Sequence, residues 1–170
     1  MTTRIKLSVL AGAGLAAMAF AGSVATAAGS DTAPIQAMEA RFAKAVQARD
    51  LNGVMSNYSA DVLVFDVSPP RQYVGAAAYR KDWQGLFASL KGPIQFKVSD
   101  LHVQAGRDLA YAHSIQALSS TDAKSGKPMS ITVRVTDVFQ KSAGAWKIIH
   151  EHVSMPVDLA TGKADMQSRP

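Results

Sequence analysis

The sequence predicts a single α+β domain, in which a strongly bent antiparallel sheet wraps around N-terminal helices and leaves a conical hollow. Apolar residues in the first half of the domain recur mostly at helical spacing, around one short β-prone run. From Ile94 to Ser154 the period changes to two, and turn residues divide this stretch into four runs. Residues 28–170 have the length of one ordinary domain.

The first helix is predicted to begin at Pro34, because proline is well tolerated in the first turn of a helix. Its buried face consists of apolar residues at helical spacing: Ile35, Met38, Phe42, Ala45 and Val46. Asp50 is expected to cap a short second helix over residues 51–57. A short β-prone run over residues 62–65 then ends at Asp66.

A loop and a third helix follow. Ser68-Pro69-Pro70 must be a loop, because neither proline can continue a strand ladder or a helix interior. Gly75 is expected to open the third helix, and Gly92-Pro93 to end it. The apolar stripe of this helix is Tyr79, Trp83, Leu86, Phe87 and Leu90.

Four strands are predicted after the helices, and hairpin turns join most of them. Their expected ranges are residues 94–103, 109–119, 129–141 and 145–154. The apolar phase changes between Val98 and Leu101, which predicts a bulge near Ser99-Asp100. The folded domain is assigned residues 34–158, and residues 159–170 are expected to form a loose tail.

The first 27 residues are expected to be a secretory signal peptide. Arg4 and Lys6 form a basic start, residues 7–21 are almost entirely apolar, and Ala25-Thr26-Ala27 offers a cleavage site. The apolar stretch falls short of the roughly 20 residues that span a bilayer, so a retained anchor is the less favoured alternative. The mature protein is therefore expected to be periplasmic or secreted, without stable membrane insertion, and to begin with a flexible lead at residues 28–33.

Composition excludes some classes of function. The chain has no cysteine, so its stability must come from packing and hydrogen bonds instead of disulfides. Its formal net charge of +5 comes from scattered bases, and no basic run is interleaved with aromatic residues, which argues against nucleic-acid binding. No cofactor is expected, because the mature chain has no glycine-rich phosphate loop.

The last strand contains the clearest candidate site. His150, His152 and Ser154 alternate along it, so they share a face with Trp146 and Ile148, which we expect to look inward. Histidine titrates near neutrality and can donate or accept a proton. His150 is therefore a candidate catalytic residue, and His152 and Ser154 are candidates for substrate binding. The alternative is that both histidines are hydrogen-bonded within a polar core.

The other face of this strand is expected to hold Lys147 and Glu151, pointing away from the hollow. His113 is a further candidate for substrate binding. A metal ion shared by His113, His150 and His152 is a less favoured alternative, since catalytic zinc needs three protein ligands in a defined geometry. No metal is therefore predicted.

Two carboxyl groups are candidates for catalysis. Asp66 follows an apolar strand, and a carboxylate at the mouth of an apolar hollow has a raised pKa and can act as a general base. The alternative role for Asp66 is to cap backbone N–H groups of the loop. Asp137 shares a strand face with Val133 and Val135. If that face is inward, Asp137 is buried and Arg134 points outward.

Tyr58 and Trp83 are aromatic candidates for substrate binding at the rim of the hollow, and packing in the core is their alternative role.

Three segments, in this order and spacing, resemble the SnoaL-like, ketosteroid-isomerase-related branch of the nuclear-transport-factor-2-like superfamily. They are Phe42 through Val54, Tyr58-Ser-Ala-Asp-Val-Leu-Val-Phe-Asp66, and residues 134–156 with Trp146-Lys-Ile-Ile-His-Glu-His-Val-Ser154. The resemblance covers about residues 34–158 and implies the cone-shaped fold and a dimer. The last segment is also similar to the association domain of calcium/calmodulin-dependent kinase II, which is not an enzyme.

The resemblance also implies a site. In ketosteroid isomerases an aspartate at the end of the first strand is the general base, and Asp66 matches it. A second, protonated aspartate donates to the developing oxyanion, and Asp137 falls at that position. Phe42 replaces a tyrosine that donates beside it, and losing one such donor typically costs on the order of a hundredfold in rate.

The sequence thus predicts an exported, small-molecule-binding homodimer. Its chemistry would be proton transfer of the isomerase or lyase type on a carbonyl compound. The alternative is a non-catalytic module for ligand binding or dimerisation.

Overall fold

The computed structural model describes residues 32–166. The expected signal peptide and residues 28–31 of the lead lie outside the described residues. The helices are α1 (Thr32–Ala48), α2 (Leu51–Met55) and α3 (Ala76–Ser89). The strands are β1 (Tyr58–Phe65), β2 (Tyr73–Val74), β3 (Leu90–Ala105), β4 (Leu109–Asp122), β5 (Pro128–Ser142), β6 (Ala145–Ser154), β7 (Val157–Asp158) and β8 (Lys163–Ala164).

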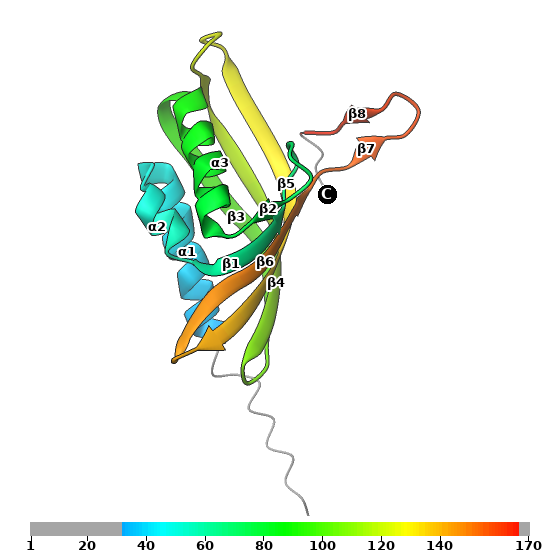
Figure 1. The fold of residues 1–170 in the computed structure, drawn as a ribbon. Helices are drawn as coiled ribbons and strands as arrows, with labels where there is room; N and C mark the ends of the chain where they lie inside the picture. Colours follow the sequence, from blue (N-terminus) through cyan, green and yellow to red (C-terminus); the bar gives the residue numbers. More distant parts are fainter. Residues whose placement is uncertain (1–31, 167–170) are drawn as a thin grey trace, which may run out of the picture.

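A curved sheet of six strands, in the order β2-β1-β6-β5-β4-β3, has all three helices on one side (Figure 1). The predicted α+β class is confirmed. Neighbouring strands are antiparallel except β1 and β6, which run parallel. The prediction of a purely antiparallel sheet was therefore wrong at this pair, because hairpin turns fix the direction only of strands that are consecutive in the chain.

Local signals place the helices close to their predicted bounds. The Asp50 side chain caps α2 by accepting a hydrogen bond from the Gly53 N–H at 2.9 Å. Gly75 precedes α3, as expected, but α3 ends at Ser89 and Gly92 lies inside β3. The chain is already extended at Leu90, which pairs with Asp122 of β4, so strand pairing ends this helix before the glycine does.

Arg49 joins the end of α1 to the start of β3. Its guanidinium donates to the carbonyl oxygens of Phe87 at 2.8 Å and Gly92 at 2.7 Å. These bonds hold the end of α3 against α1, and α3 forms one wall of the candidate site described below.

The predicted bulge in β3 is confirmed. The β3–β4 register shifts between Ser99 and His102, and Asp100 has a φ of 51°. The extra residue lets the long strand bend around the helices.

The end of the described chain departs from the expected loose tail. β7 and β8 pair as a hairpin that stands away from the rest of the molecule (Figure 1). Beyond it, the Thr132 N–H donates to the carbonyl oxygen of Met166 at 2.8 Å, which returns the chain to β5. None of the helices within residues 32–166 is long and apolar enough to cross a membrane.

The core lies between α1, α3 and the inner face of the sheet. Its fully buried side chains are Ile35, Val46, Val54, Val62, Val64, Tyr79 and Phe139. This packing fills the base of the curved sheet, and the space nearer α3 remains open as a cavity.

Candidate functional site

A cavity of about 400 Å³ lies between α3 and the inner face of the sheet. This volume is within the range of small-molecule sites. Four aromatic side chains line it: Phe42, Tyr79, Trp83 and Phe96. Aliphatic side chains of β4, β5 and β6 and the polar groups of Asp66, Asp82, Gln116 and Glu151 complete the walls.

A bulge in β6 decides which side chains of the last strand reach this cavity. Ile148 pairs with Phe139, whereas His150 pairs with Val138, so Ile149 has no partner on β5. One extra residue reverses the alternation of side chains beyond it. The expectation that one unbroken face runs from Trp146 to Ser154 was therefore wrong.

The histidines consequently lie on the outer face of the sheet, the face opposite the helices. The Nδ1 atom of His150 lies 2.9 Å from the carbonyl oxygen of Leu63 on β1. His152 is exposed, and its ring lies 5.8 Å from that of Phe65. Ser154 pairs with the exposed Arg134, so it faces the same way. The prediction that His150, His152 and Ser154 face the hollow was wrong.

His113 is also on the outer face, where its exposed ring stacks on that of His102 at 5.0 Å. His113 and His152 are separated by β5, because both pair with Thr136. The described part of the chain contains no group of three or more His, Cys, Asp or Glu side chains arranged to hold a metal ion.

Glu151 takes the place that the histidines were expected to hold. It is 5% exposed and lines the cavity. The Tyr58 hydroxyl donates to its Oε2 at 2.8 Å, and the Tyr79 hydroxyl donates to its Oε1 at 2.5 Å. Burial raises the pKa of Glu151, although the two tyrosine hydrogen bonds oppose the rise.

Asp66 lines the cavity at the end of β1 and combines both roles considered for it. Its Oδ1 accepts a hydrogen bond from the Val67 N–H at 2.6 Å, as a loop cap would. Its Oδ2 lies 3.3 Å from the Tyr79 hydroxyl. Burial raises the pKa of Asp66, so a proton can be held or released there closer to neutrality.

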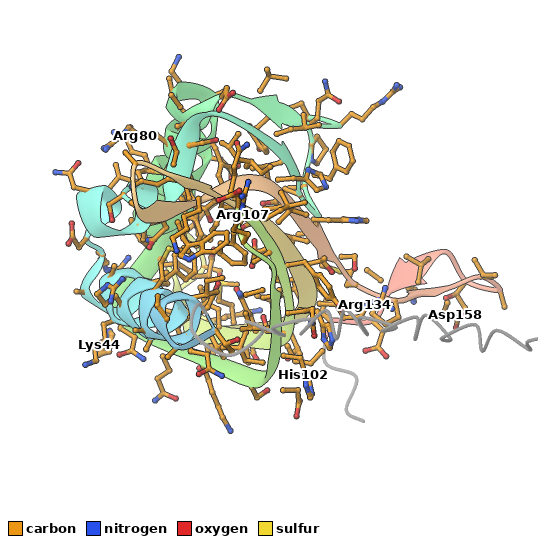
Figure 2. All side chains as sticks on the ribbon, turned by 90° about the horizontal axis from the view of Figure 1, so that it is seen from below. Lys44, Arg80, His102, Arg107, Arg134 and Asp158 are labelled. Atoms are coloured by element: carbon orange, nitrogen blue, oxygen red, sulfur yellow. The ribbon has the colours of Figure 1, made fainter. Side chains whose placement is uncertain are left out.

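Asp137 points inward and is 3% exposed, so the face of β5 that it shares with Val133 and Val135 is the inward one. It pairs directly with Glu151, and its Oδ1 is buried without a hydrogen-bond partner. Burial, followed by the nearby Glu151, raises the pKa of Asp137. Arg134 is exposed on the outer face, where Figure 2 shows it far from Arg80 and Lys44.

Glu39 of α1 completes a group that we call the acidic cluster: Glu39, Asp137 and Glu151. Burial and the neighbouring Glu151 raise the pKa of Glu39 to about 7. The three residues line a small hollow that shares Phe42, Gln116 and Glu151 with the cavity. The cluster therefore lies directly behind the cavity wall.

The two aromatic candidates have different positions. Trp83 lines the cavity with its ring, and its indole nitrogen is buried without a hydrogen-bond partner. Tyr58 is buried against Phe42 and Tyr79 and reaches the cavity only through Glu151.

Sequence reasoning missed Glu39, Tyr79, Gln116 and Glu151 as site residues. A signal for Glu39 was present, since it follows Met38 on the apolar face of the first helix. The two glutamates of the chain are Glu39 and Glu151, and both are buried in this cluster. Glu151 had no such signal, because the β6 bulge reverses the direction in which it points.

The fold and the cavity agree with comparisons to known proteins. A family model described as the SnoaL-like domain matches residues 35–158. The chain therefore belongs to the SnoaL-like domain family, within the nuclear-transport-factor-2-like (NTF2-like) superfamily. None of the curated proteins matches the chain.

Several solved structures share this fold. An NTF2-like protein of unknown function from Pseudomonas putida KT2440 is 32% identical, over 83% of this chain and 99% of that chain, with a TM-score of 0.74. A ketosteroid isomerase-like protein from Erwinia carotovora atroseptica is 20% identical, over 74% and 96%, with a TM-score of 0.65. A proposed dehydratase of the NTF2-like family from Streptomyces avermitilis is also 20% identical, over 73% and 95%, with a TM-score of 0.63.

Proposed function

We propose that this protein binds a small carbonyl compound in the cavity and transfers a proton on it, with Asp66 as the general base. The supporting observation is the contact of Asp66 with the Tyr79 hydroxyl at the cavity wall, 3.3 Å apart. A base and a hydroxyl this close can act on neighbouring atoms of one substrate. The SnoaL-like fold, with isomerase-like and dehydratase-like structural neighbours, is compatible with this chemistry.

The base is suited to proton abstraction because its raised pKa brings it nearer to the working pH. An ionised Asp66 removes a proton from the carbon next to the carbonyl group, and negative charge develops on the carbonyl oxygen. In this proposal the Tyr79 hydroxyl turns away from Glu151, which keeps its hydrogen bond from Tyr58, and donates to that oxygen in place of the donor that Phe42 lacks. In this proposal Asp137 does not contact the substrate, and it affects the site only through Glu151, its neighbour on β6.

The test is exchange of hydrogen for deuterium next to the carbonyl group, followed by NMR over a panel of ketones and hydroxyketones. Asp66→Asn is expected to lower the catalysed exchange rate at least about a hundredfold, since the general base is lost. Asp61→Asn, an exposed change on the same strand, is the matched control and should leave the rate unaltered. Equal exchange by wild type and Asp66→Asn would exclude Asp66 as the base.

The second candidate is a non-catalytic ligand-binding module. Phe42 favours it, because its ring packs edge-on against Trp83 and Phe96 and offers no hydrogen-bond donor at this position. Native mass spectrometry of the purified protein distinguishes the two candidates. A co-purifying ligand without any exchange activity on the carbonyl panel would favour binding alone.

We also propose that the protein is exported, with residues 1–27 as its signal peptide. The support is the layout of basic start, apolar stretch and small-residue site in the sequence. Sequencing the N-terminus of protein from the periplasmic or secreted fraction should give Ala28 as the first residue. A chain that begins at Met1 in that fraction would contradict cleavage.

The outer face of the sheet is proposed to form a homodimer. It presents Leu109 at 56% exposure and Tyr111 at 48%, with the half-buried Ile115 on the same strand. Apolar and aromatic side chains exposed together on one sheet face are typical of a surface that a second copy covers.

A further inference from the structure

We propose that the substrate of this cavity carries an organic cation, such as a protonated amine or a quaternary ammonium group. The inference rests on the proposed function and narrows its substrate to a carbonyl compound with a positively charged group. Three features support it: carboxyl groups without counter-ions, aromatic walls and an unpartnered carboxyl oxygen behind the wall.

The charged groups of the cavity are mostly acidic. Asp66, Asp82 and Glu151 line it, against one basic residue, the exposed Lys81. The one ion pair within residues 32–166 joins Arg107 and Asp108, both exposed at a distant turn. The cavity carboxyls are therefore held by hydroxyl and backbone donors and not by cations.

This arrangement contrasts with the charge of the whole chain. The protein has a formal net charge of +5, yet both of its glutamates are buried beside the cavity. Long-range attraction by the protein therefore favours anions, whereas the cavity favours cations. A preference for cations measured in solution would have to come from the local groups.

The walls add a second attraction. Phe42 lies in edge-to-face contact with Trp83 and Phe96, with ring centroids 5.6 and 5.9 Å apart, and all three rings line the cavity. The faces of aromatic rings attract cations, most strongly where water is excluded. Aromatic rings that line a cavity together with carboxyl groups are a common way to recognise an ammonium group.

The inner end of the site lacks positive charge. Asp137 Oδ1 is buried without a partner, behind the wall that Phe42, Gln116 and Glu151 share with the cavity. A cation bound against Glu151 would reduce the repulsion between these carboxyl groups. It would also favour their ionised forms, so binding should release protons and strengthen as the pH rises.

The experiment compares three probes of similar size and shape: benzyltrimethylammonium, benzyl alcohol and benzoate. Binding to the full-length protein is measured by isothermal titration calorimetry at about 150 mM salt, which screens surface charge. The cation is expected to bind at least about tenfold more tightly than benzoate, with the alcohol between them. Repeating the cation titration in two buffers of different ionisation enthalpy should reveal released protons.

Variants locate the effect. Glu151→Gln and Asp66→Asn should each weaken binding of the cation several-fold and leave the alcohol nearly unchanged. Asp66→Asn is the safer variant for folding, because Asp66 is only partly buried. The control Asp61→Asn removes an exposed carboxyl of β1 that does not line the cavity, so it should bind all three probes as wild type does.

Benzoate binding as tight as the cation would overturn the inference, and so would the absence of binding by all three probes. Unchanged cation affinity in both folded cavity variants would overturn it as well. These outcomes are separate from the proposed proton transfer, because the titrations involve no turnover. If the cation bound more tightly than benzoate but the protein catalysed no deuterium exchange, the cation site would be supported and the proposed proton transfer would be contradicted.

Discussion

Tyr79 connects the two carboxyl groups that matter most in this site. Its single hydroxyl hydrogen points to Glu151 Oε1 at 2.5 Å, while Asp66 Oδ2 lies 3.3 Å from the same oxygen. One hydrogen cannot serve both acceptors fully, and the shorter bond takes it. Asp66 therefore receives the weaker of the two Tyr79 hydrogen bonds, which opposes the rise in the Asp66 pKa less than burial raises it.

Replacing Tyr79 by phenylalanine tests this connection. Tyr79→Phe is expected to lower the free energy of unfolding by about 1 to 3 kcal/mol, because a buried acceptor of Glu151 loses its donor. The pKa of Glu151 should rise further, since the tyrosine hydrogen bond lowers it. Urea denaturation measures the first effect. Carbon-13 NMR of glutamate-labelled protein measures the second, with only two glutamates in the chain.

The control for that change is Tyr111→Phe on the outer face, where the tyrosine is 48% exposed. It removes the same hydroxyl from the face that is proposed to meet a second copy, so both variants are compared at protein concentrations that keep the chain monomeric. There the change should alter stability by no more than about 0.5 kcal/mol. Equal effects of the two variants would mean that the Tyr79 hydrogen bond contributes nothing specific.

At the scale of elements, the bulge at Ile149 determines the composition of the site. It sits in a strand held on both sides, by β5 and by β1, and the register on both sides resumes at His150. Val138 and Leu63 thereby pair with His150 on the outer face, and Asp137 and Val64 pair with Glu151 on the inner face. A single unpaired residue thus turns the carboxyl group of Glu151 toward the cavity and the imidazole groups of His150 and His152 away from it.

Deleting Ile149 should reverse this exchange. Without the bulge, Glu151 would turn to the outer face and the histidines toward the core, unless the strand slips out of register. Either result breaks buried contacts, so the free energy of unfolding should fall by at least about 3 kcal/mol. Thermal denaturation followed by circular dichroism is the measurement.

Ile149→Val is the matched control, because it keeps the residue count and should cost no more than about 1.5 kcal/mol. If the deletion variant melted like Ile149→Val, the bulge would not be what holds Glu151 inside.

At the scale of the whole molecule, the acidic cluster makes folding depend on pH. The pKa of Glu39 rises on folding from an ordinary value of 4.5 to about 7, because of burial and Glu151. The folded state therefore binds a proton more tightly than the unfolded state between these values. This stabilisation is fully present below pH 4.5 and is lost as the pH rises to about 7.

The free energy of unfolding is accordingly expected to decrease on the order of 3 kcal/mol between pH 4.5 and pH 7 through Glu39 alone. Glu39→Gln should flatten this part of the curve, since an amide stays neutral. Urea denaturation across the pH range is the measurement. Gln36→Glu, on the exposed side of the same helix, is a control that should leave the slope in place. A wild-type stability that rises with pH over this window would contradict the cluster's role.

The proposed dimer is also a property of the whole molecule. Ile115→Arg places a charge in the middle of the outer face, opposite Arg134 of β5. The variant is expected to sediment as a monomer while retaining its cavity, because like charges would oppose contact between two copies. Analytical ultracentrifugation at several concentrations provides the test. Wild-type protein that stays monomeric throughout would rule out a dimer through this face.

The sequence by itself determined the main helices and the long strands, since each depends on local chemistry, but not the short strands β2, β7 and β8. Helical spacing identified α1 and α3, the Asp50 side chain identified the cap of α2, and alternation identified β4 and β5. Alternation also placed Asp137 on the same face as Val133 and Val135, and the structure decided that this face is the inward one.

Only the tertiary structure decided which groups meet in the cavity. The parallel pairing of β6 with β1 and the bulge at Ile149 arise from contacts between residues distant in the chain, and no local pattern encodes them. Because side chains in a strand alternate with a period of two, one unpaired residue reverses every position after it. The sequence located the right strand, and packing decided that Glu151, and not His150, faces the site.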